Sequence, residues 1–261
     1  MRAIDLSDEH RELFSMCLED WSEEAAEAGP RRGCWIDRHL QRGLRAKLAL
    51  DDSGEVGGMI QYLPIEESWA DGEDLYLILC IWVHGHKQGR GNFQGHGMGS
   101  ALLEAAEADA EAFGAKGMAA WGIALPFWMK ASWFRKHGYM KADRQGMAVL
   151  LWKPFAADAA QPRWFDKGTQ LPEPMPGKVN VTVFTSGWCM AQNLVAERSR
   201  RAAEEFGDSV VYREIDTSER AVVTKWGFTD ELFIDGKKVR TGPPPSCEKI
   251  KSLIGKRARR L

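Results

Sequence analysis

LYLILCIWVHGHKQGRGNFQGHGMGSALL, residues 75–103, is the stretch that decides the fold. Its first nine residues are apolar without alternation, which predicts a central β-strand covered on both faces. From Ser100 onward the spacing of apolar residues predicts an amphipathic helix. The apolar face of that helix would carry Leu102, Leu103, Ala106, Ala110 and Phe113. Glycines recur between strand and helix, so the segment that joins them is a candidate ligand-binding loop.

Two common phosphate-binding motifs do not fit this glycine-rich segment. The phosphate loop of nucleotide hydrolases needs Gly-Lys-Ser/Thr before the helix, and the segment contains no such triplet. The dinucleotide motif G-x-G-x-x-G would need glycine at Gln94 in one register and at Ser100 in the other. In each register, therefore, one required glycine is replaced by another residue.

A third motif, Q/R-x-x-G-x-G/A between a strand and a helix, fits Gln94, Gly97 and Gly99. The competing register from Gln88 meets Phe93 in place of a small residue and stops short of the helix. Unobstructed backbone N–H groups at a helix N-terminus can surround a pyrophosphate. The motif therefore predicts a pyrophosphate loop, and the alternative is a surface loop without a ligand. The preceding residues 84–93 read as an additional flexible, basic segment, a cover over the cofactor or the acceptor.

The strand, the motif QGHGMGSALL and the helix together resemble the GCN5-related N-acetyltransferase (GNAT) superfamily over about residues 1–152. The segment WFRKHGY, residues 133–139, is similar to one near the end of that family's domain. The resemblance implies a mixed sheet flanked by helices, an acetyltransferase activity and acetyl-CoA as cosubstrate. The end of the strand would pair with the pantetheine arm, and an amide there would polarise the thioester carbonyl. The cofactor-binding residues implied are Ile81, Trp82, Val83, Gln94, Gly95, His96, Gly97, Met98, Gly99 and Ser100.

Acetyl transfer to an amine needs a neutral amine, a stabilised oxyanion and a proton for the departing thiolate. Many GNAT enzymes supply that proton from a tyrosine, but the matching residue here is Phe134, and Tyr139 follows the glycine. Tyr139 is a candidate acid and, alternatively, a packing residue. Glu66 and Glu67 are candidates for the base, with a solvated acidic loop as the alternative. Cys80 reads as a core thiol, or as a group facing the active site.

The remaining elements of residues 1–152 follow from local patterns. Residues 4–21 predict a strand and then a helix from about Ser7, and residues 34–44 predict a second helix. Residues 45–50 and 56–65 flank the turn DDSG and predict a hairpin. Strands are predicted over 117–124 and 146–152, with a helix over 127–138 between them. The predicted order is β-α-α-β-β-β-α-β-α-β.

Residues 153–177 form a proline-rich linker, and residues 178–261 form a second domain. The predicted order β-α-β-α-β-β-α, with Trp188-Cys189 after the first strand, resembles the thioredoxin fold. The match to redox chemistry is partial, because Gln192 stands where a second cysteine is needed and Asp230 lies near the expected cis-proline. A helix N-terminus would favour the Cys189 thiolate, whereas a nearby carboxylate would oppose it. A reactive Cys189 and a purely structural Cys189 both stay open.

Composition excludes several other classes of protein. The chain has 261 residues, a net charge of −2 and 44% hydrophobic residues, which describes a globular protein of two modest domains. Its longest apolar run is too short to span a bilayer, so no membrane partner is predicted. Five scattered cysteines favour a reducing compartment, and the N-terminus lacks an apolar leader, so we expect the cytoplasm. The short basic end GKRARRL is a weak basis for nucleic-acid binding. His84, His86 and His96 lack a third fixed ligand, so no metal site is predicted.

Three functions follow from these patterns. The first is an acetyl-CoA-dependent N-acetyltransferase that acts on an amine of an unidentified small molecule or peptide. A GNAT domain followed by a thioredoxin-like domain resembles the YoaP-type acetyltransferases, a resemblance that leaves the acceptor undefined. The second is a protein that binds thiols or soft metals through Cys189, with a GNAT domain that senses CoA without catalysis. The third is a monothiol reductase-like enzyme. The acceptor and the oligomeric state are left open by the sequence.

Overall fold

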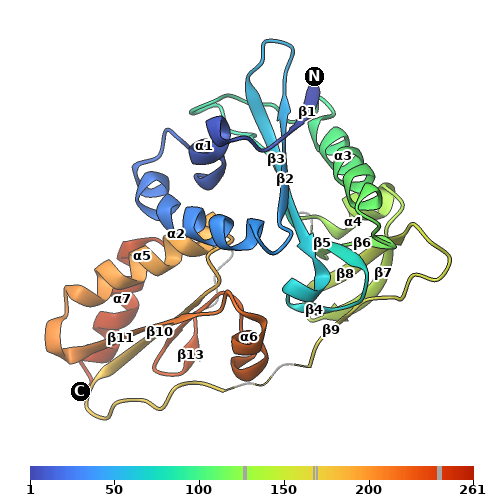
Figure 1. The fold of residues 1–261 in the computed structure, drawn as a ribbon. Coiled ribbons are helices and arrows are strands. Elements are labelled where there is room, and N and C mark those ends of the chain that lie inside the picture. Colours follow the sequence, from blue (N-terminus) through green and yellow to red (C-terminus); the bar gives the residue numbers. More distant parts are fainter. Residues whose placement is uncertain (126–127, 167, 169, 240–242) are drawn as a thin grey trace. The chain divides into compact units, whose positions relative to one another are not determined.

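The computed structural model describes residues 1–125, 128–166, 168, 170–239 and 243–261, which form two compact units (Figure 1). The first unit consists of Met1–Trp21 and Ile36–Phe165, and the second of Ser22–Trp35 and Asp166–Leu261. Helix α2 (Glu23–Leu40) therefore contributes residues to both units. The sequence-based division at residues 152 and 178 remains a prediction, and the structural division differs from it in assigning Ser22–Trp35 to the second unit.

The first unit is built on a seven-stranded sheet with the order β1-β2-β3-β5-β6-β8-β7. Neighbouring strands are antiparallel except for β5 and β6, which run parallel. This mixed sheet with flanking helices confirms the predicted α/β fold class. The strands are β1 (Arg2–Asp5), β2 (Arg45–Leu50), β3 (Val56–Pro64), β5 (Leu75–Val83), β6 (Gly117–Ile123), β7 (Met140–Gln145) and β8 (Ala148–Pro154).

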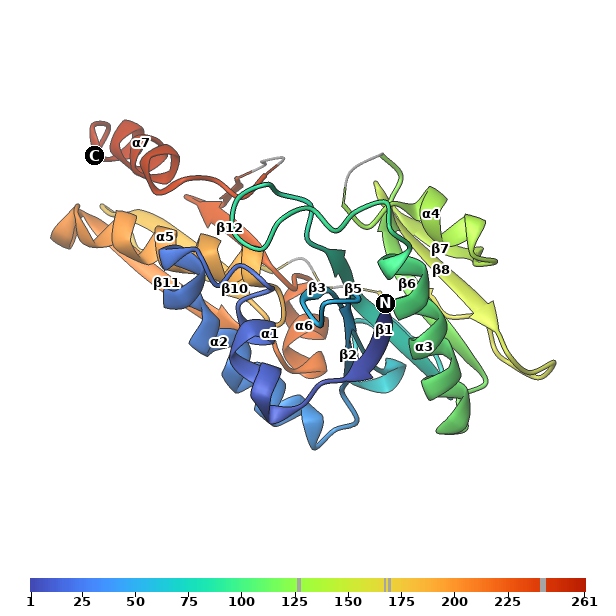
Figure 2. The same ribbon diagram turned by 90° about the horizontal axis from the view of Figure 1, so that it is seen from above.

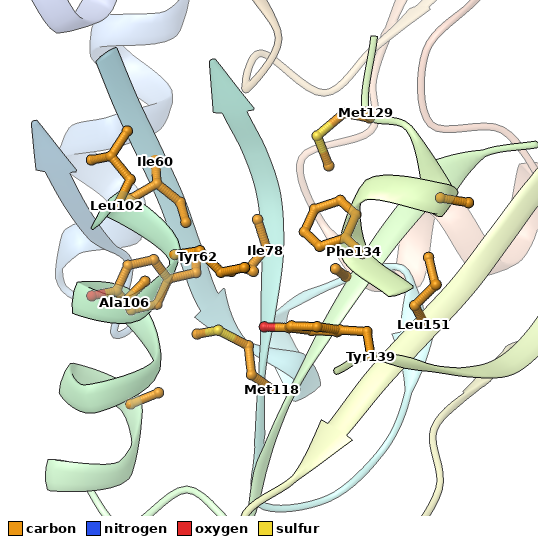
Figure 3. Packing of buried hydrophobic residues seen from close by; sticks show 14 of the residues in the cluster. Ile60, Tyr62, Ile78, Leu102, Ala106, Met118, Met129, Phe134, Tyr139 and Leu151 are labelled. Carbon is orange, nitrogen blue, oxygen red and sulfur yellow. The ribbon is translucent and has the colours of Figure 1, made fainter. Parts of the chain in front are cut away.

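Helices α1 (Arg11–Ser15) and α3 (Met98–Ala112) lie on opposite sides of strands β2 and β3 (Figures 1 and 2). Between α3 and the sheet lies a core cluster that Figure 3 draws in part. The sheet contributes Ile60 and Ile78 to this cluster, and α3 contributes Leu102. Helix α4 (Ala131–Lys136) adds the fully buried Phe134. These contacts set the face of β5 on which α3 and its N-terminal loop sit.

Short elements complete the first unit. Two 3-10 turns, η1 (Asp8–His10) and η2 (Ile65–Glu67), precede α1 and follow β3. Strand β4 (Ala70–Asp71) pairs with β9 (Arg163–Trp164) in a separate two-stranded sheet. Part of the predicted linker thus packs within the first unit, where the backbone N–H of Trp164 also donates to Asp143 Oδ2 at 2.9 Å.

Several predicted elements differ from those in the structure. The first helix is short because its backbone turns at Cys17 and Leu18. The helix predicted over 127–138 spans only Ala131–Lys136, and Phe127 lies outside the described residues. Strand β7 was not predicted, because its sequence MKADRQ is polar and mostly exposed, as suits an edge strand. Helix α2 begins at Glu23, well before the predicted start at Cys34.

The second unit contains a four-stranded sheet with the order β11-β10-β12-β13. Strands β10 and β11 are parallel, whereas β10–β12 and β12–β13 are antiparallel. The observed order, β-α-β-α-β-β-α, confirms the predicted order of elements. The elements are β10 (Val179–Thr185), α5 (Met190–Glu204), η3 (Gly207–Ser209), β11 (Val210–Asp216), α6 (Arg220–Trp226), β12 (Glu231–Ile234), β13 (Lys237–Lys238) and α7 (Cys247–Ala258).

The residues of α2 that belong to the second unit are held there by charge pairs. Arg31 pairs with Glu197 and Glu214, and Glu24 pairs with Arg198. The fully buried Arg32 donates from Nε to the backbone carbonyl of Trp188 at 2.9 Å. In the part of the chain that the structure describes, no helix combines the length and the apolar character needed to cross a membrane.

Candidate functional site

Strand β5 changes its pairing partway along its length. Its register with β3 shifts at one point, where Gln61 faces Cys80 and Tyr62 faces Ile78, so that Leu79 is an extra residue. Such a bulge bends a strand and increases its twist. The ladder between β5 and β6 ends at the same place, at the pair of Ile78 and Ala120. Among the described residues, β6 offers no ladder partner to residues 79–83, so the two strands separate there.

The indole of Trp121 is placed where the strands separate. Its Nε1 donates to the carbonyl of Leu79 at 2.8 Å, and its ring meets that of Trp128 edge-on at 5.2 Å. Trp121 and Trp133 are half-buried beside the core cluster. Beyond this contact the edge of β5 that faces β6 presents main-chain groups for an extended ligand to pair with. The predicted pantetheine residues Ile81, Trp82 and Val83 lie on this part of β5.

The loop between β5 and α3 has the conformation that its glycines permit. Gly95 and Gly97 have φ of 83° and 84°, in the left-handed region that other residues rarely adopt. Gly97 is the N-cap of α3, and the first helical bond runs from Ala101 N–H to Gly97 O at 3.1 Å. The N–H groups of residues 98–100, which come before the first helical donor Ala101, have no acceptor within the helix. They point out of the helix N-terminus, where an anion is favoured.

The space above this loop is open. A Cβ atom added to Gly95 would meet nothing within 4 Å, and one added to Gly97 would meet only Met1 Cε at 3.7 Å. The first turn of α3 contains no acidic residue. Both properties suit a pyrophosphate, because neither a side chain nor a negative charge opposes it.

Gln94 joins the glycine loop to the end of β5 by a side-chain hydrogen bond. Its Nε2 donates to the carbonyl of Val83 at 3.2 Å, and its backbone N–H donates to Asn92 Oδ1 at 3.0 Å. A Cβ atom at Gly85 would come within 2.2 Å of Gln94 Nε2. Gln94 therefore positions the loop through strand β5, and glycine at position 85 makes room for it.

His137 is a residue near the loop that the sequence did not single out. Its Nδ1 lies 2.9 Å from the carbonyl of Trp133, and a carbonyl can only accept, so we assign the proton to Nδ1. Nε2 is then the acceptor for the hydroxyl of Ser100 at 2.9 Å. The ring of Trp133 lies 4.1 Å from that of His137, and a Cβ atom added to Gly99 would lie 3.4 Å from the same indole. Helix α3 is thus hydrogen-bonded to the C-terminal end of α4. Local sequence patterns do not predict this contact between distant residues.

The segment 84–93, predicted to be flexible, has several defined contacts. Gly85 and Asn92 form an antiparallel bridge, and His84 N–H donates to the carbonyl of Gly57 at 2.9 Å. Arg90 reaches the carbonyl of Val56 at 3.2 Å and also pairs with acidic side chains of neighbouring segments. The segment is therefore attached to β3, and its proposed role as a cover remains a prediction.

Tyr139, a candidate acid, lies inside the core cluster (Figure 3). Only 3% of it is exposed, and its ring packs edge-on against Phe134 at 5.4 Å. Burial, and then the charge of Glu107, raise the pKa of Tyr139 well above its ordinary value. This environment suits a packing residue, which was the alternative reading of Tyr139.

Glu66 and Glu67, the candidate bases, lie in η2 at the other end of β3 and β5. There Pro64 pairs with Tyr76, whereas the glycine loop follows the end at which Gly58 pairs with Val83. Glu66 accepts a hydrogen bond from Asp74 N–H at 2.9 Å, and Glu67 lies 3.6 Å from Arg42. The structure thus brings neither carboxylate to the glycine loop. Cys80 is buried within β5.

Cys189 belongs to the second unit, where it is the N-cap of α5 and only 8% exposed. Asp230 lies just before β12 and accepts hydrogen bonds at 2.9 Å from Ser186 N–H and Oγ. Burial raises the pKa of Asp230 to about 6, although the bonds from Ser186 oppose this shift. In the described residues no group of three or more metal-binding side chains is present.

The raised pKa of Asp230 predicts how stability changes with pH. Between about pH 4 and pH 6 the folded chain keeps a proton that the unfolded chain has lost, so stability falls as the pH rises through this window. The change is about 1.4 kcal/mol for each pKa unit that burial adds. Asp230→Asn should flatten this part of a curve of unfolding free energy against pH. An unchanged curve would show that Asp230 ionises normally.

Comparisons with known proteins agree with this geometry. The model of the acetyltransferase (GNAT) family matches residues 6–139, slightly more than half of the chain. No curated protein matches the chain.

Three solved structures of acetyltransferases each match 59% of the chain. PaiA N-acetyltransferase from Thermoplasma acidophilum, solved in complex with coenzyme A, is 18% identical to this chain, with a TM-score of 0.43. The match covers 59% of this chain and 100% of the PaiA chain. Ribosomal-protein-alanine N-acetyltransferase from Brucella melitensis is 15% identical with a TM-score of 0.45 and the same coverage. Aminoglycoside 6′-acetyltransferase type Ii is 14% identical with a TM-score of 0.44, covering 59% of this chain and 97% of its own.

The family match thus spans the bulged strand, the glycine loop and the helix that follows it. The chain belongs to the acetyltransferase (GNAT) family, and it is an N-acetyltransferase that uses acetyl-CoA as cosubstrate.

Proposed function

We propose that this enzyme transfers the acetyl group of acetyl-CoA directly to an amine of a small molecule or peptide. The observation that carries the proposal is the coincidence of two features on one strand. Among the described residues the β5–β6 ladder ends at Ile78, and the glycine loop with the N-terminus of α3 follows the end of the same strand. A ligand with a pyrophosphate and an extended arm fits these two features together.

In this arrangement the chain would hold acetyl-CoA mainly through its backbone. The N–H groups of residues 95–100 would surround the pyrophosphate, and the helix dipole would add to their attraction. An N–H of residues 79–83 would donate to the thioester carbonyl and stabilise the oxyanion as it forms. Ser100 and His137 would keep the first turn of α3 in place. Since Phe134 has no ionisable group, solvent would protonate the departing thiolate.

A more specific proposal concerns the fold of the second unit. We propose that it is thioredoxin-like, as in YoaP-type acetyltransferases, with the domains at 1–152 and 178–261 joined by the linker 153–177. Support comes from the central β10, which pairs parallel with β11 and antiparallel with β12, and from Cys189 at the start of α5. The unit would shape the acceptor site or present Cys189 to the acceptor.

The test of the proposed activity combines binding and turnover. We expect calorimetry to show one acetyl-CoA site per chain. We also expect thiol release from acetyl-CoA with at least one member of a panel comprising an aminoglycoside, a polyamine, an arylamine and a peptide with N-terminal alanine. Mass spectrometry should find the product heavier by one acetyl group on nitrogen. Binding of acetyl-CoA without turnover on any amine would instead favour a CoA-sensing domain.

A further inference from the structure

An indole joins strands β5 and β6 at the point where their pairing ends. Ile78 and Ala120 form the last pair of the parallel ladder among the described residues. The next residues are Leu79 on β5 and Trp121 on β6, and Trp121 Nε1 donates to the carbonyl of Leu79 at 2.8 Å. Beyond this bond β5 stays paired with β3, and β6 stays paired with β8. Trp121 therefore lies at the closed end of the region between the two strands, which we call the strand gap.

The main-chain groups of β5 that face the strand gap follow from the alternation of an antiparallel ladder. His84 N–H donates to the carbonyl of Gly57 at the start of β3, at 2.9 Å. The N–H and carbonyl groups of Ile81 and Val83 therefore turn away from β3, towards the strand gap. The carbonyl of Val83 accepts the bond from Gln94 Nε2. Ile81 is thus placed to pair with an extended ligand through both of its main-chain groups.

The length of the strand gap fits the pantetheine arm of acetyl-CoA. One end is at Val83, to which the glycine loop is bonded through Gln94, and the other is at Leu79. At about 3.3 Å per residue, the strand between Leu79 and Val83 is about 13 Å long. Between its pyrophosphate and its sulfur, pantetheine has about a dozen chain atoms, as many as the backbone of about four residues. With the pyrophosphate in the glycine loop, the thioester would come level with Trp121.

The indole of Trp121 is held in a fixed orientation. Its Nε1 is bonded to Leu79, and its ring meets that of Trp128 at an interplanar angle of 78°. The segment that follows Trp128 is attached to β6, because Ile123 N–H donates to the carbonyl of Met129 at 2.7 Å. Both indoles are half-buried. Trp121 cannot turn aside without losing its bond to Leu79, so a group that enters the closed end of the strand gap meets a rigid ring.

We propose that Trp121, supported by Trp128, limits the length of the acyl group, so that the enzyme uses acetyl-CoA and rejects acyl-CoAs with longer chains. This inference rests on the proposed acetyl transfer and adds to it the class of acyl donor. An acetyl group has a single methyl beyond its carbonyl carbon. Each further methylene would extend towards the indole and would have to displace it, which close-packed interiors resist.

The length of the acyl chain does not enter the bond changes of the transfer. The lone pair of the amine forms a C–N bond with the thioester carbonyl carbon, and the C–S bond breaks with its electron pair on sulfur. A proton of the amine passes through solvent to the thiolate. The alkyl group beyond the carbonyl carbon keeps all its bonds, so selection among acyl-CoAs depends on space alone. One methylene in an apolar site typically changes kcat/KM by about 10–200-fold.

The kinetic test compares acetyl-CoA with butyryl-CoA, using the most active amine of the panel. In the wild type, kcat/KM should favour acetyl-CoA by about 100-fold or more. Trp121→Phe removes part of the ring and should reduce this preference to about 10-fold, and Trp121→Leu should nearly abolish it. Trp121→Phe is also the milder substitution, and it decides the test if Trp121→Leu does not fold. A wild type that uses both donors equally, or an unchanged preference in the folded variants, would overturn the proposal.

Trp152→Leu is the matched control, because it removes an indole from β8, on the edge of β6 away from β5. Trp152 is buried and pairs with Ala119, so its loss also leaves a space in the sheet, but outside the strand gap. The control should therefore keep the wild-type preference for acetyl-CoA. A preference lost equally in Trp152→Leu and Trp121→Leu would show general loosening of the sheet and would refute the role of Trp121.

A binding measurement needs no acceptor and separates this inference from the proposed function. Calorimetry should show that the wild type binds butyryl-CoA about 10-fold more weakly than acetyl-CoA, and that Trp121→Phe and Trp121→Leu bind the two more nearly alike. If the wild type acetylates no amine of the panel, the proposed transfer fails, and these affinities alone decide the role of Trp121. Equal wild-type affinities for the two acyl-CoAs would then overturn it.

Discussion

Asp109→Ala is expected to lower the free energy of unfolding by about 1–3 kcal/mol, the typical cost of leaving buried donors without their acceptor. Asp109 lies on α3, and only 13% of its side chain is exposed. It accepts two hydrogen bonds from Arg45 on β2, one of them 2.9 Å long, and one from Tyr62 Oη at 2.5 Å. Lys47 Nζ lies 3.3 Å away. Without Asp109, two cations and a buried hydroxyl would lose their shared partner.

Chemical denaturation of Asp109→Ala and of Glu111→Ala, an exposed carboxylate on the same helix, provides the comparison. The control should change the unfolding free energy by less than about 0.5 kcal/mol. Burial acts to raise the pKa of Asp109, but the hydrogen bonds from Arg45 and Tyr62 outweigh it and lower the pKa. The stabilisation is therefore present above about pH 4 and is lost as the pH falls through the lowered pKa. A loss below about 1 kcal/mol at neutral pH would show that the network contributes little.

This network also bears on acetyl-CoA binding, because it attaches α3 to the sheet. Asp109 is near the C-terminal end of α3, whereas Ser100 and His137 secure its first turn. The glycine loop depends on both anchors, since the amides that would face the pyrophosphate belong to the start of the same helix. Loss of stability in Asp109→Ala should therefore be accompanied by weaker acetyl-CoA binding near its unfolding midpoint, and acetyl-CoA should raise that midpoint.

Strand β5 and the glycine loop could be predicted because their signals are local. Nine consecutive apolar residues specify a buried strand, and the spacing of Gln94, Gly97 and Gly99 specifies a loop that needs left-handed glycine. The hairpin of β12 and β13 was predictable for the same reason, as Asp235 and Gly236 both have positive φ.

Helix α2 shows where local signals fail. Pro30 and the glycines at positions 29 and 33 argue against a helix before Cys34, yet the helix runs from Glu23. Ala25 and Arg32 are fully buried, and Arg31 pairs with glutamates of α5 and β11. These contacts with residues distant in the chain outweigh the low helix propensity.

Gly97→Trp is expected to weaken acetyl-CoA binding by roughly 100-fold or more, which would abolish turnover at micromolar cosubstrate. The indole would occupy the open space above the loop, where the pyrophosphate must lie against the amides of residues 98–100. In addition, φ at this position is 84°, so any side chain strains the helix N-cap. Isothermal titration of acetyl-CoA measures the effect directly.

Gly54→Trp is the matched control, because Gly54 also has positive φ, at 91°, and a Cβ atom there would meet nothing within 4 Å. It lies in the turn between β2 and β3, so the substitution carries a similar backbone strain without entering the loop. If both variants lose binding equally, strain alone explains the loss and the loop is not the pyrophosphate site. If only Gly97→Trp loses binding while both keep similar melting temperatures, the loss is specific to the loop.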